Sequence, residues 1–240
     1  AVAVFVVGMA WRTASWLRKP VPFPLTLDPS HCGVTGQAAA IAKELLLFSS
    51  LYRGDRQLWL WAGLMHASLA TIVLGHVVGI SFLSQQFTHL GVSSATSTAL
   101  SQTLGVVFGL LFVVSVFVLF YRRSAVPELK RLSDPADYFD LTLLLAIAIT
   151  GLLMRLMPME LDQTEVRTYL CALLTFRPVS IPSQWIFLSH FALVNVLLTY
   201  FPFSTLVHLT GGVVSLALVV QSARAHPSRL GVKPDVPFLR

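Results

Sequence analysis

Five long apolar runs divide this sequence, and they restrict the fold more than any other feature. A membrane-spanning helix needs about 20 mostly apolar residues, and lipid leaves helices or closed barrels as the only spanning structures. The runs cover residues 1–17, 58–83, 98–121, 138–157 and 184–220. The last contains Pro202, which removes a backbone donor and favours a kink. The sequence therefore predicts an all-α integral membrane bundle of five transmembrane helices.

The amino-acid composition agrees with a lipid environment. Hydrophobic residues make up 55% of the chain and charged residues only 12%, whereas a soluble domain carries about 25% charged residues. The net charge of +6 does not indicate nucleic-acid binding, because basic residues of membrane proteins gather in cytoplasmic connections. The sequence begins at Ala1 inside an apolar run, which we interpret as a truncated first membrane helix. We predict a multi-pass protein of the inner (cytoplasmic) membrane with no nucleic-acid partner.

The connections between the runs differ in charge, and this difference predicts the orientation. The connection 18–57, the turn after the third run and the tail 223–240 are rich in Lys and Arg. Residues 84–97 contain neither, and the connection after the fourth run contains only Arg167 and Arg177, with Arg155 at its edge. Because positive residues stay inside, the N-terminus is predicted outside and the C-terminus in the cytoplasm.

The predicted cytoplasmic connection 18–57 has two parts. Its first part, KPVPFPLTLDPS, is rich in proline and predicts an extended segment. Its second part, QAAAIAKELLLFSSLYRGDRQLW, predicts an amphipathic helix with Ala, Leu and Phe on one side. Such a helix either lies along the membrane surface or docks a partner subunit, and the sequence leaves both interpretations open.

Four histidines lie inside two of the predicted spans. His66 and His76 belong to the second span, and His190 and His208 to the fifth. Polar groups in lipid are costly and mark functional sites. The two spans run antiparallel, so His76 is predicted opposite His190, and His66 opposite His208. Neutral imidazole binds haem iron, so this pattern predicts two haems, one near each membrane face.

Two details qualify this haem prediction. Ten helical residues rise ~15 Å and eighteen rise ~27 Å, so tilting or a kink near Pro202 has to bring the two pairs level. The two cysteines, Cys32 and Cys171, form neither a CxxC nor a CxxCH motif. A covalently attached haem and a cysteine-bound iron–sulfur cluster are therefore not predicted, and the haems are expected to be of b type.

Three segments resemble the respiratory nitrate reductase gamma-subunit family. HASLATIVLGH resembles the second helix of that family, and HFALVNVLLTYFPFSTLVH resembles its last helix with the same eighteen-residue histidine spacing. FYRRSAVPELKRLSDPADYFDLTLLL resembles its basic cytoplasmic turn. The resemblance implies a dihaem cytochrome b domain over residues 1–222, which exchanges electrons between menaquinone or ubiquinone and a cytoplasmic iron–sulfur partner. It implies that the four axial haem ligands are His66, His76, His190 and His208.

The cytoplasmic connection points to one branch of this family. Its ELLLF-SLYRGDRQLW pattern is similar to the membrane cytochrome b of the Dsr complex of sulfur metabolism. Residues 84–97 also lack the lysine that nitrate reductase gamma subunits carry near their quinone site, and Thr96 falls about there. This branch implies an iron–sulfur partner of the heterodisulfide-reductase type, together with other membrane or extracytoplasmic subunits. A nitrate reductase gamma subunit is the alternative.

Further residues are candidates for contacts with the haems and the quinone. Arg155 and Arg123 are candidate partners of haem propionates near the outer and inner face, respectively. Gly75 removes a side chain beside His76, and residues 79–89 supply hydroxyl, amide and imidazole groups. We therefore predict the quinone site at the outer haem, with residues 37–51 as the competing site.

A membrane anchor or a transporter without haem is the alternative from another class. A transporter with a polar midplane site would carry paired acidic groups or broken helices. The spans show no Asp or Glu well inside, and an anchor gives no reason for opposed histidine pairs. We therefore favour the quinone-reactive electron-transfer subunit of an oxidoreductase complex.

Overall fold

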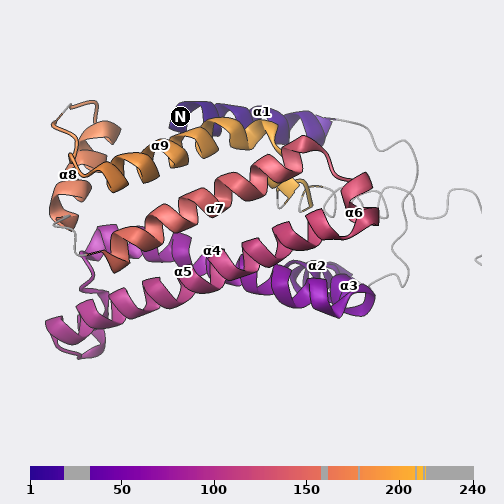
Figure 1. Cartoon of the computed structure of the whole chain (residues 1–240), viewed down its shortest axis with the longest axis horizontal. Helices are drawn as coiled ribbons and strands as arrows, with labels where there is room; N and C mark the ends of the chain where they lie inside the picture. The colour runs from indigo at the N-terminus through magenta and orange to yellow at the C-terminus, as the bar shows by residue number, and fades with distance from the viewer. Residues whose placement is uncertain (19–32, 158–161, 178, 209, 213, 215–240) are drawn as a thin grey trace, which may run out of the picture. The chain divides into compact units, whose positions relative to one another are not determined.

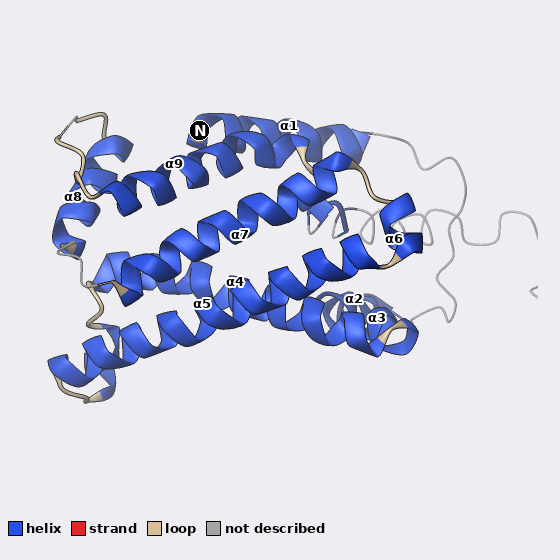
Figure 2. Ribbon diagram, in the orientation of Figure 1, coloured by secondary structure: helices blue, strands red, loops and turns tan. Residues whose placement is uncertain are grey.

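All regular structure in the described residues is helical (Figure 2). The computed structural model describes residues 1–18, 33–157, 162–177, 179–208, 210–212 and 214. The chain divides into two compact units. We call residues 1–2 and 50–200 the bundle unit, and residues 3–49 and 201–240 the terminal unit. The predicted all-α fold is confirmed. The proline-rich segment predicted to be extended lies outside the described residues.

Four long helices form the bundle unit (Figure 1). They are α4 (Arg56–Phe82), α5 (Ser94–Ala125), α7 (Pro135–Leu156) and α9 (Trp185–Tyr200). Neighbours along the chain pack together, as α4 on α5, α5 on α7, and α7 on α9. Each is long and apolar enough to cross a membrane, the last one including residues 201–203. The chain is a multi-pass membrane protein. The predicted span over residues 1–17 and the predicted orientation stay predictions.

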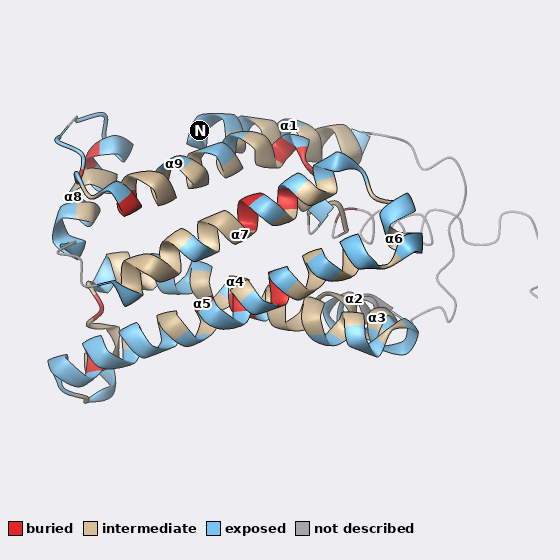
Figure 3. Cartoon of the chain, in the orientation of Figure 1, coloured by how far each residue is buried: buried red, intermediate tan, exposed pale blue. Residues whose placement is uncertain are grey.

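Many large apolar residues of these helices are exposed. Figure 3 shows exposed positions along the length of each helix. Val73, Leu74, Val77 and Phe117 are each more than half exposed. The buried positions are few and lie mainly on the two middle helices, α5 and α7. In water such a surface would be unfavourable, so its natural surroundings are lipid chains.

One carboxylate connects the start of α4 to the end of α5. Asp55 is the N-cap of α4, and its side chain accepts a hydrogen bond of 2.9 Å from the backbone N–H of Leu58. The other oxygen of the same carboxylate lies 2.6 Å from Nη2 of Arg122 in the last turn of α5. This contact fixes the two helix ends relative to each other.

The same end of the bundle, which we call the α6 end, holds a second ion pair. The short helix α6 (Pro127–Arg131) connects α5 to α7. Arg123 Nη1 lies 2.6 Å from Asp137 Oδ2 and 3.0 Å from the Ser133 hydroxyl. Asp137 also accepts a hydrogen bond from the backbone N–H of Asp134, within a capping box at the start of α7. Arg123 therefore links α5 to the start of α7.

A polar turn and a short helix lie at the opposite end, which we call the α8 end. After α4 the chain turns through Leu83 and Ser84, both with positive φ, into the 3₁₀ helix η1 (Gln86–Leu90). The helix α8 (Gln163–Leu174) lies between α7 and α9 in the sequence and begins at the N-cap Asp162. It was not predicted from the sequence.

The terminal unit contains α1 (Val2–Arg18), α2 (Gly33–Leu47) and the segment after α9. The predicted fifth span, 184–220, is not one helix: α9 ends at Tyr200, and two 3₁₀ turns follow, η2 (Phe201–Phe203) and η3 (Thr205–Val207). Pro202 lies in the first of them and is fully buried, as expected for a residue that lacks a backbone donor. Residues 215–220 lie outside the described residues.

The predicted amphipathic helix over residues 37–59 is helical but interrupted. α2 ends at Leu47, and Phe48 adopts a left-handed conformation with a φ of 48°. α3 (Ser49–Gly54) follows, and the extended N-cap Asp55 separates it from α4. Residues with positive φ end a helix. The alternatives of membrane surface and partner docking both remain for these shorter helices.

Helix α1 packs on the segment after α9 through a glycine. A Cβ atom added at Gly8 would lie 2.7 Å from Cβ of Pro202, which is part of a rigid ring. Arg12 Nη1 donates a hydrogen bond to the Pro202 carbonyl oxygen. The rings of Phe5 and Phe201 meet edge to face with centres 5.4 Å apart. A side chain at position 8 would therefore separate α1 from this segment.

We expect Gly8→Ala to destabilise the protein by about 1–3 kcal/mol, because overpacking forces the backbone to shift. The loss of stability is measured by thermal unfolding in detergent, monitored by circular dichroism. The matched control is Gly63→Ala in the middle of α4, where no atom lies within 4 Å of an added Cβ. The control should be neutral or stabilising, since Ala favours helix over Gly. Equal melting curves for both variants would show that the Gly8 contact does not matter.

Candidate functional site

The structure brings together two of the four predicted histidines. His76 lies in α4 and His190 in α9, toward the α8 end of the bundle unit. Their imidazole ring centres are 6.3 Å apart and their planes are parallel within 5°. The helices α4 and α9 are not neighbours along the chain, so this contact comes from the tertiary fold.

The hydrogen bonds of these two histidines define their tautomers. Nδ1 of His76 lies 2.7 Å from the carbonyl oxygen of Ile72, one turn earlier in the same helix. Nδ1 of His190 lies 3.1 Å from the carbonyl oxygen of Ile147 in α7. A carbonyl oxygen can only accept, so Nδ1 must carry the proton in both rings. Each neutral ring then keeps the lone pair of Nε2 for a metal ion.

The separation of the two rings suits a single metal ion between them. Metal–imidazole bonds are about 2 Å long, so two imidazoles on opposite sides of one metal ion have ring centres about 6 Å apart. Within the described residues, no third His, Cys, Asp or Glu joins them in a possible metal-binding group. Two imidazoles alone suit a metal ion whose other ligands do not come from the protein. Haem iron is such a metal, because the porphyrin ring supplies its other ligands. The residues present therefore fit haem.

Gly75 and Gly79 leave space on α4 beside His76. An added Cβ would have no atom within 4 Å at either position. The two glycines are four residues apart and therefore lie on one face of the helix. His76 itself is exposed. A flat ring can approach α4 closely along this face.

His66 belongs to the bundle unit and His208 to the terminal unit. Nδ1 of His66 lies 2.8 Å from the carbonyl oxygen of Ala62 in α4. Nδ1 of His208, which follows η3, lies 3.1 Å from the carbonyl oxygen of Thr205. Carbonyl oxygens only accept, so Nδ1 carries the proton in both rings. Their mutual pairing stays a prediction.

The polar residues of the turn at the α8 end mainly hold that turn in place. The side-chain amide of Gln85 donates to Thr98, and that of Gln86 to Ser101, at 3.0 and 2.6 Å. The carbonyl oxygen of Ser84 accepts from the hydroxyl of Ser97 at 2.7 Å. These bonds attach the turn to the start of α5. Within the segment 79–89, His89 and Ser81 remain exposed.

Arg155 is placed at the α8 end by a glycine of α5. Its guanidinium lies against Gly105, where an added Cβ would collide with it. Nη1 lies 3.3 Å from Oε1 of Gln102, and the amide of Gln102 donates to the Arg155 carbonyl oxygen at 2.6 Å. These partners are neutral, so they do not compensate the positive charge of the guanidinium. That charge is available to pair with an anion. Arg155 lies one turn beyond Gly151, which contacts the His190 ring.

Sequence reasoning missed one buried acid. Asp140 lies in the second turn of α7 and is only 3% exposed. The Tyr200 side chain at the end of α9 lies close to this carboxylate. The sequence did not predict an acid well inside a span, because Asp140 stands close to the polar start of its apolar run. Its burial depends on α9, which the sequence pattern does not place.

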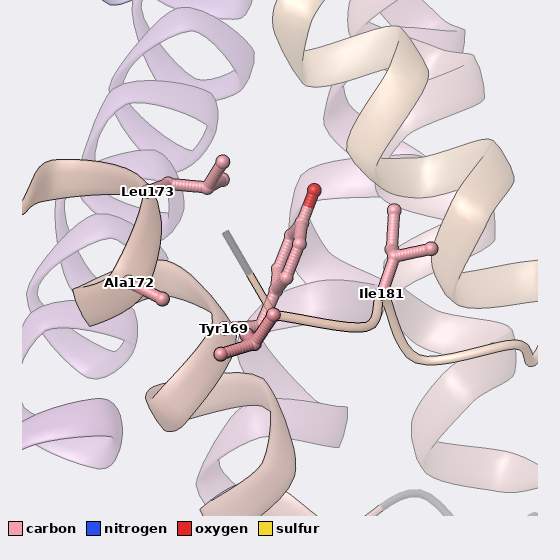
Figure 4. A pocket seen from close by; sticks show the side chains of 5 residues that line it. Tyr169, Ala172, Leu173 and Ile181 are labelled. Carbon is pink, nitrogen blue, oxygen red and sulfur yellow. The ribbon is translucent and has the colours of Figure 1, made fainter. Parts of the chain in front are cut away.

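A small apolar cavity lies beside α8 (Figure 4). Its volume is about 320 Å³, and Tyr169, Ala172, Leu173, Val179 and Ile181 line it. The Tyr169 ring meets the Phe191 ring edge to face, with centres 5.7 Å apart. Among the described residues that line it, only Tyr169 carries a polar side-chain group, its hydroxyl. The cavity includes neither His76 nor His190, so we do not assign it to the histidine site.

Comparison with known proteins shows clear similarity to one family. The family model of the nitrate reductase gamma subunit matches residues 47–223, which include all four histidines. The cytochrome b-like subunit of an Hdr-like menaquinol oxidoreductase from Archaeoglobus fulgidus is 31% identical over 248 residues, covering 88% of this chain and 74% of the relative. The corresponding subunit from Archaeoglobus profundus is 28% identical over 252 residues, covering 87% and 73%. The nitrate reductase gamma chain of Bacillus subtilis is 26% identical over 155 residues, covering 61% and 69%.

Proposed function

Because this chain belongs to the nitrate reductase gamma subunit family, we propose that it is a dihaem cytochrome b that transfers electrons between a membrane quinone and a cytoplasmic partner. The observation that carries the proposal is the parallel pair of His76 and His190, 6.3 Å apart, with both Nδ1 atoms hydrogen-bonded. A haem, when bound, supplies one-electron chemistry, and the protein provides binding, orientation and electrostatics.

We assign His76 and His190 as axial ligands of one haem, and His66 and His208 as ligands of the other. In all four rings the Nδ1 proton is directed to a backbone carbonyl oxygen, which is the usual second contact of a ligating histidine. This contact fixes the ring orientation and keeps Nε2 deprotonated. The chain thus orients its imidazoles for iron through backbone carbonyl oxygens.

Arg155 is the proposed partner of a haem propionate at the α8 end. It lies one turn beyond Gly151, and its partners among the described residues are neutral. A guanidinium can bind a carboxylate through two parallel hydrogen bonds. The corresponding role of Arg123 has less support, because its guanidinium already contacts Asp137 at 2.6 Å. We propose only Arg155 for this role.

The quinone site is proposed on the face of α4 formed by Gly75 and Gly79. Both positions are open, and they lie next to His76. The Archaeoglobus relatives are named as subunits of menaquinol oxidoreductases, so we propose menaquinol rather than ubiquinol as the substrate. Two polar residues of this segment are exposed, His89 and Ser81. The imidazole of His89 can take up a quinol proton, and the Ser81 hydroxyl can hydrogen-bond to the quinol.

We propose an iron–sulfur partner at the α6 end of this chain. The two relatives with the longest matches carry an Hdr-like name, which favours an iron–sulfur partner of the heterodisulfide-reductase type over the nitrate reductase branch. We place this chain in a Dsr-type complex of sulfur metabolism. We propose that the α6 end faces the cytoplasm, where the partner would accept or donate electrons. The positive residues at this end support that orientation.

The haem content tests the function directly. We expect about two non-covalent haems per chain, because four imidazoles are available in two pairs. Pyridine haemochrome analysis of the purified, membrane-extracted protein measures this number. Acid–acetone extraction should remove all haem, since no CxxCH motif exists. Folded protein that contains no haem would exclude the proposal and favour an anchor or a transporter.

A further inference from the structure

The two facing histidines are held in different ways. His76 directs Nδ1 to its own helix, at the Ile72 carbonyl oxygen. His190 directs Nδ1 to the neighbouring helix α7, where it meets two oxygen atoms. One is the Ile147 carbonyl oxygen at 3.1 Å, and the other is the Thr150 hydroxyl at 3.0 Å. The position of the His190 ring therefore depends on a side chain of another helix.

The hydrogen-bond directions around Thr150 follow from its neighbours. Its hydroxyl oxygen lies 2.9 Å from the carbonyl oxygens of Ala146 and Ile147 in its own helix. Carbonyl oxygens only accept, so the hydroxyl proton goes to one of these two. The lone pair of the Thr150 oxygen is then free to accept the Nδ1 proton of His190. A chain of hydrogen bonds therefore runs from His190 Nδ1 through the Thr150 hydroxyl to a backbone carbonyl oxygen of α7.

Gly151 allows this approach. A Cβ atom added there would lie 3.1 Å from Cε1 of His190 and 3.5 Å from its Nδ1. The first distance is below ordinary van der Waals contact. The sequence Thr150–Gly151 thus supplies an acceptor and the space for the ring in consecutive positions of α7.

We propose that Thr150 is a positioning residue that orients His190 and raises its basicity as an iron ligand. This inference rests on the proposed haem ligation. An acceptor at the second ring nitrogen raises the basicity of the first. A more basic ligand stabilises the oxidised iron and lowers the reduction potential of its haem. The reduction potential of the haem bound by His76 and His190 is therefore tuned by a side chain of α7.

The test compares Thr150→Val and Thr150→Ser in the purified haem-containing protein. Valine keeps the shape and removes the acceptor, so the midpoint potential of one haem should rise while that of the other is unchanged. The Ile147 carbonyl oxygen remains, so we expect at most about a tenfold change in the reduction equilibrium, or about 59 mV for one electron. Serine keeps the hydroxyl and should restore the original potential. Spectroelectrochemical titration measures both haems.

Two further variants make the result specific. Thr199→Val in α9 removes a hydroxyl that bonds only its own helix, at the Asn195 carbonyl oxygen, and should change neither potential. Gly151→Ala should shift the low-spin electron paramagnetic resonance signal of the same haem, because the new methyl group presses on the His190 ring. This measurement also serves if Thr150→Val fails to fold.

The outcomes separate the inference from the function. Protein without haem would reject the proposed function itself. Two haems with unchanged potentials in Thr150→Val, and an unchanged resonance signal in Gly151→Ala, would overturn only the inference. A shift of both haems, or a valine effect that serine does not reverse, would also overturn it. Loss of one haem in Thr150→Val but not in Thr150→Ser would support it.

Discussion

His76→Ala and His190→Ala are each expected to abolish the same haem and to leave the other in place. The two rings face each other at 6.3 Å, so either one alone offers half of the axial ligands that a low-spin iron requires. His66→Ala and His208→Ala should instead remove the second haem. Redox titration of the α-band in each single variant, combined with haem quantification, identifies the lost component. Quinol-dependent electron transfer through the chain should fall by at least about tenfold in each.

The control for these four variants is His89→Ala. His89 is exposed in η1, and its ring meets Phe82 rather than another histidine. This variant should keep both haems. If His66→Ala and His190→Ala lost the same spectral component, the proposed pairing would be wrong. Retention of both haems in His76→Ala would remove the assignment of the facing pair.

Gly75→Leu is expected to slow haem reduction by a quinol analogue strongly while both haems stay bound. No atom lies within 4 Å of an added Cβ at this position, so the leucine should occupy the open face of α4 without disturbing the fold. The leucine side chain should keep the quinol ring about 3 Å farther from α4. A displacement of reacting groups by only about 1 Å can cost about a hundredfold in rate, so we expect the second-order rate constant to fall by about a hundredfold. Stopped-flow spectroscopy of haem reduction measures the rate.

Val73→Leu is the matched control. Val73 is 55% exposed at nearly the same depth in α4 but points to the roughly opposite side of the helix. It should react normally with quinol. Normal kinetics in Gly75→Leu, together with loss of activity in Leu46→Gln, would move the quinone site to the competing segment 37–51. Leu46 is 76% exposed near the end of α2.

The membrane helices could be predicted because their apolar runs are continuous. Three predicted spans match α4, α5 and α7 to within about four residues at each end, with α5 showing the largest difference. The error at α5 has a physical cause. Its helix begins at the N-cap Ser93 and continues through Arg122 and Arg123, where hydropathy has already fallen. Helices extend beyond the hydrocarbon region when polar caps and ion pairs stabilise their ends.

The last span and α8 could not be predicted from hydropathy. The run 184–220 remains apolar through Pro202, whereas the α-helix ends at Tyr200. Apolar composition does not report the loss of the backbone donor that ends the helix there. α8 begins with polar residues after Asp162 and is only 12 residues long, so its pattern is too short for a span.

The histidines of the candidate site could be predicted from the sequence, whereas the contact of Thr150 with His190 could not. The antiparallel order of the two spans indicated that His76 and His190 would meet, and the structure places them together. It did not indicate that Thr150 would approach His190. A threonine within an apolar run normally bonds its own helix, and Thr150 does so as well. The rotation of α7 against α9 decides the additional contact, and one sequence alone does not contain it.

Asp55 is both the N-cap of α4 and the ion-pair partner of Arg122, and these two roles together restrict which residues can occupy position 55. An N-cap requires a short side chain with an acceptor, which Asn and Ser also provide. The contact with Arg122 requires a negative charge, which Glu also provides. Of these residues, only aspartate meets both requirements, and exchanging the charges of the pair would leave α4 without its cap. We therefore expect an order in the divergence of this family: Asn or Ser becomes acceptable at position 55 once the arginine at position 122 has been replaced.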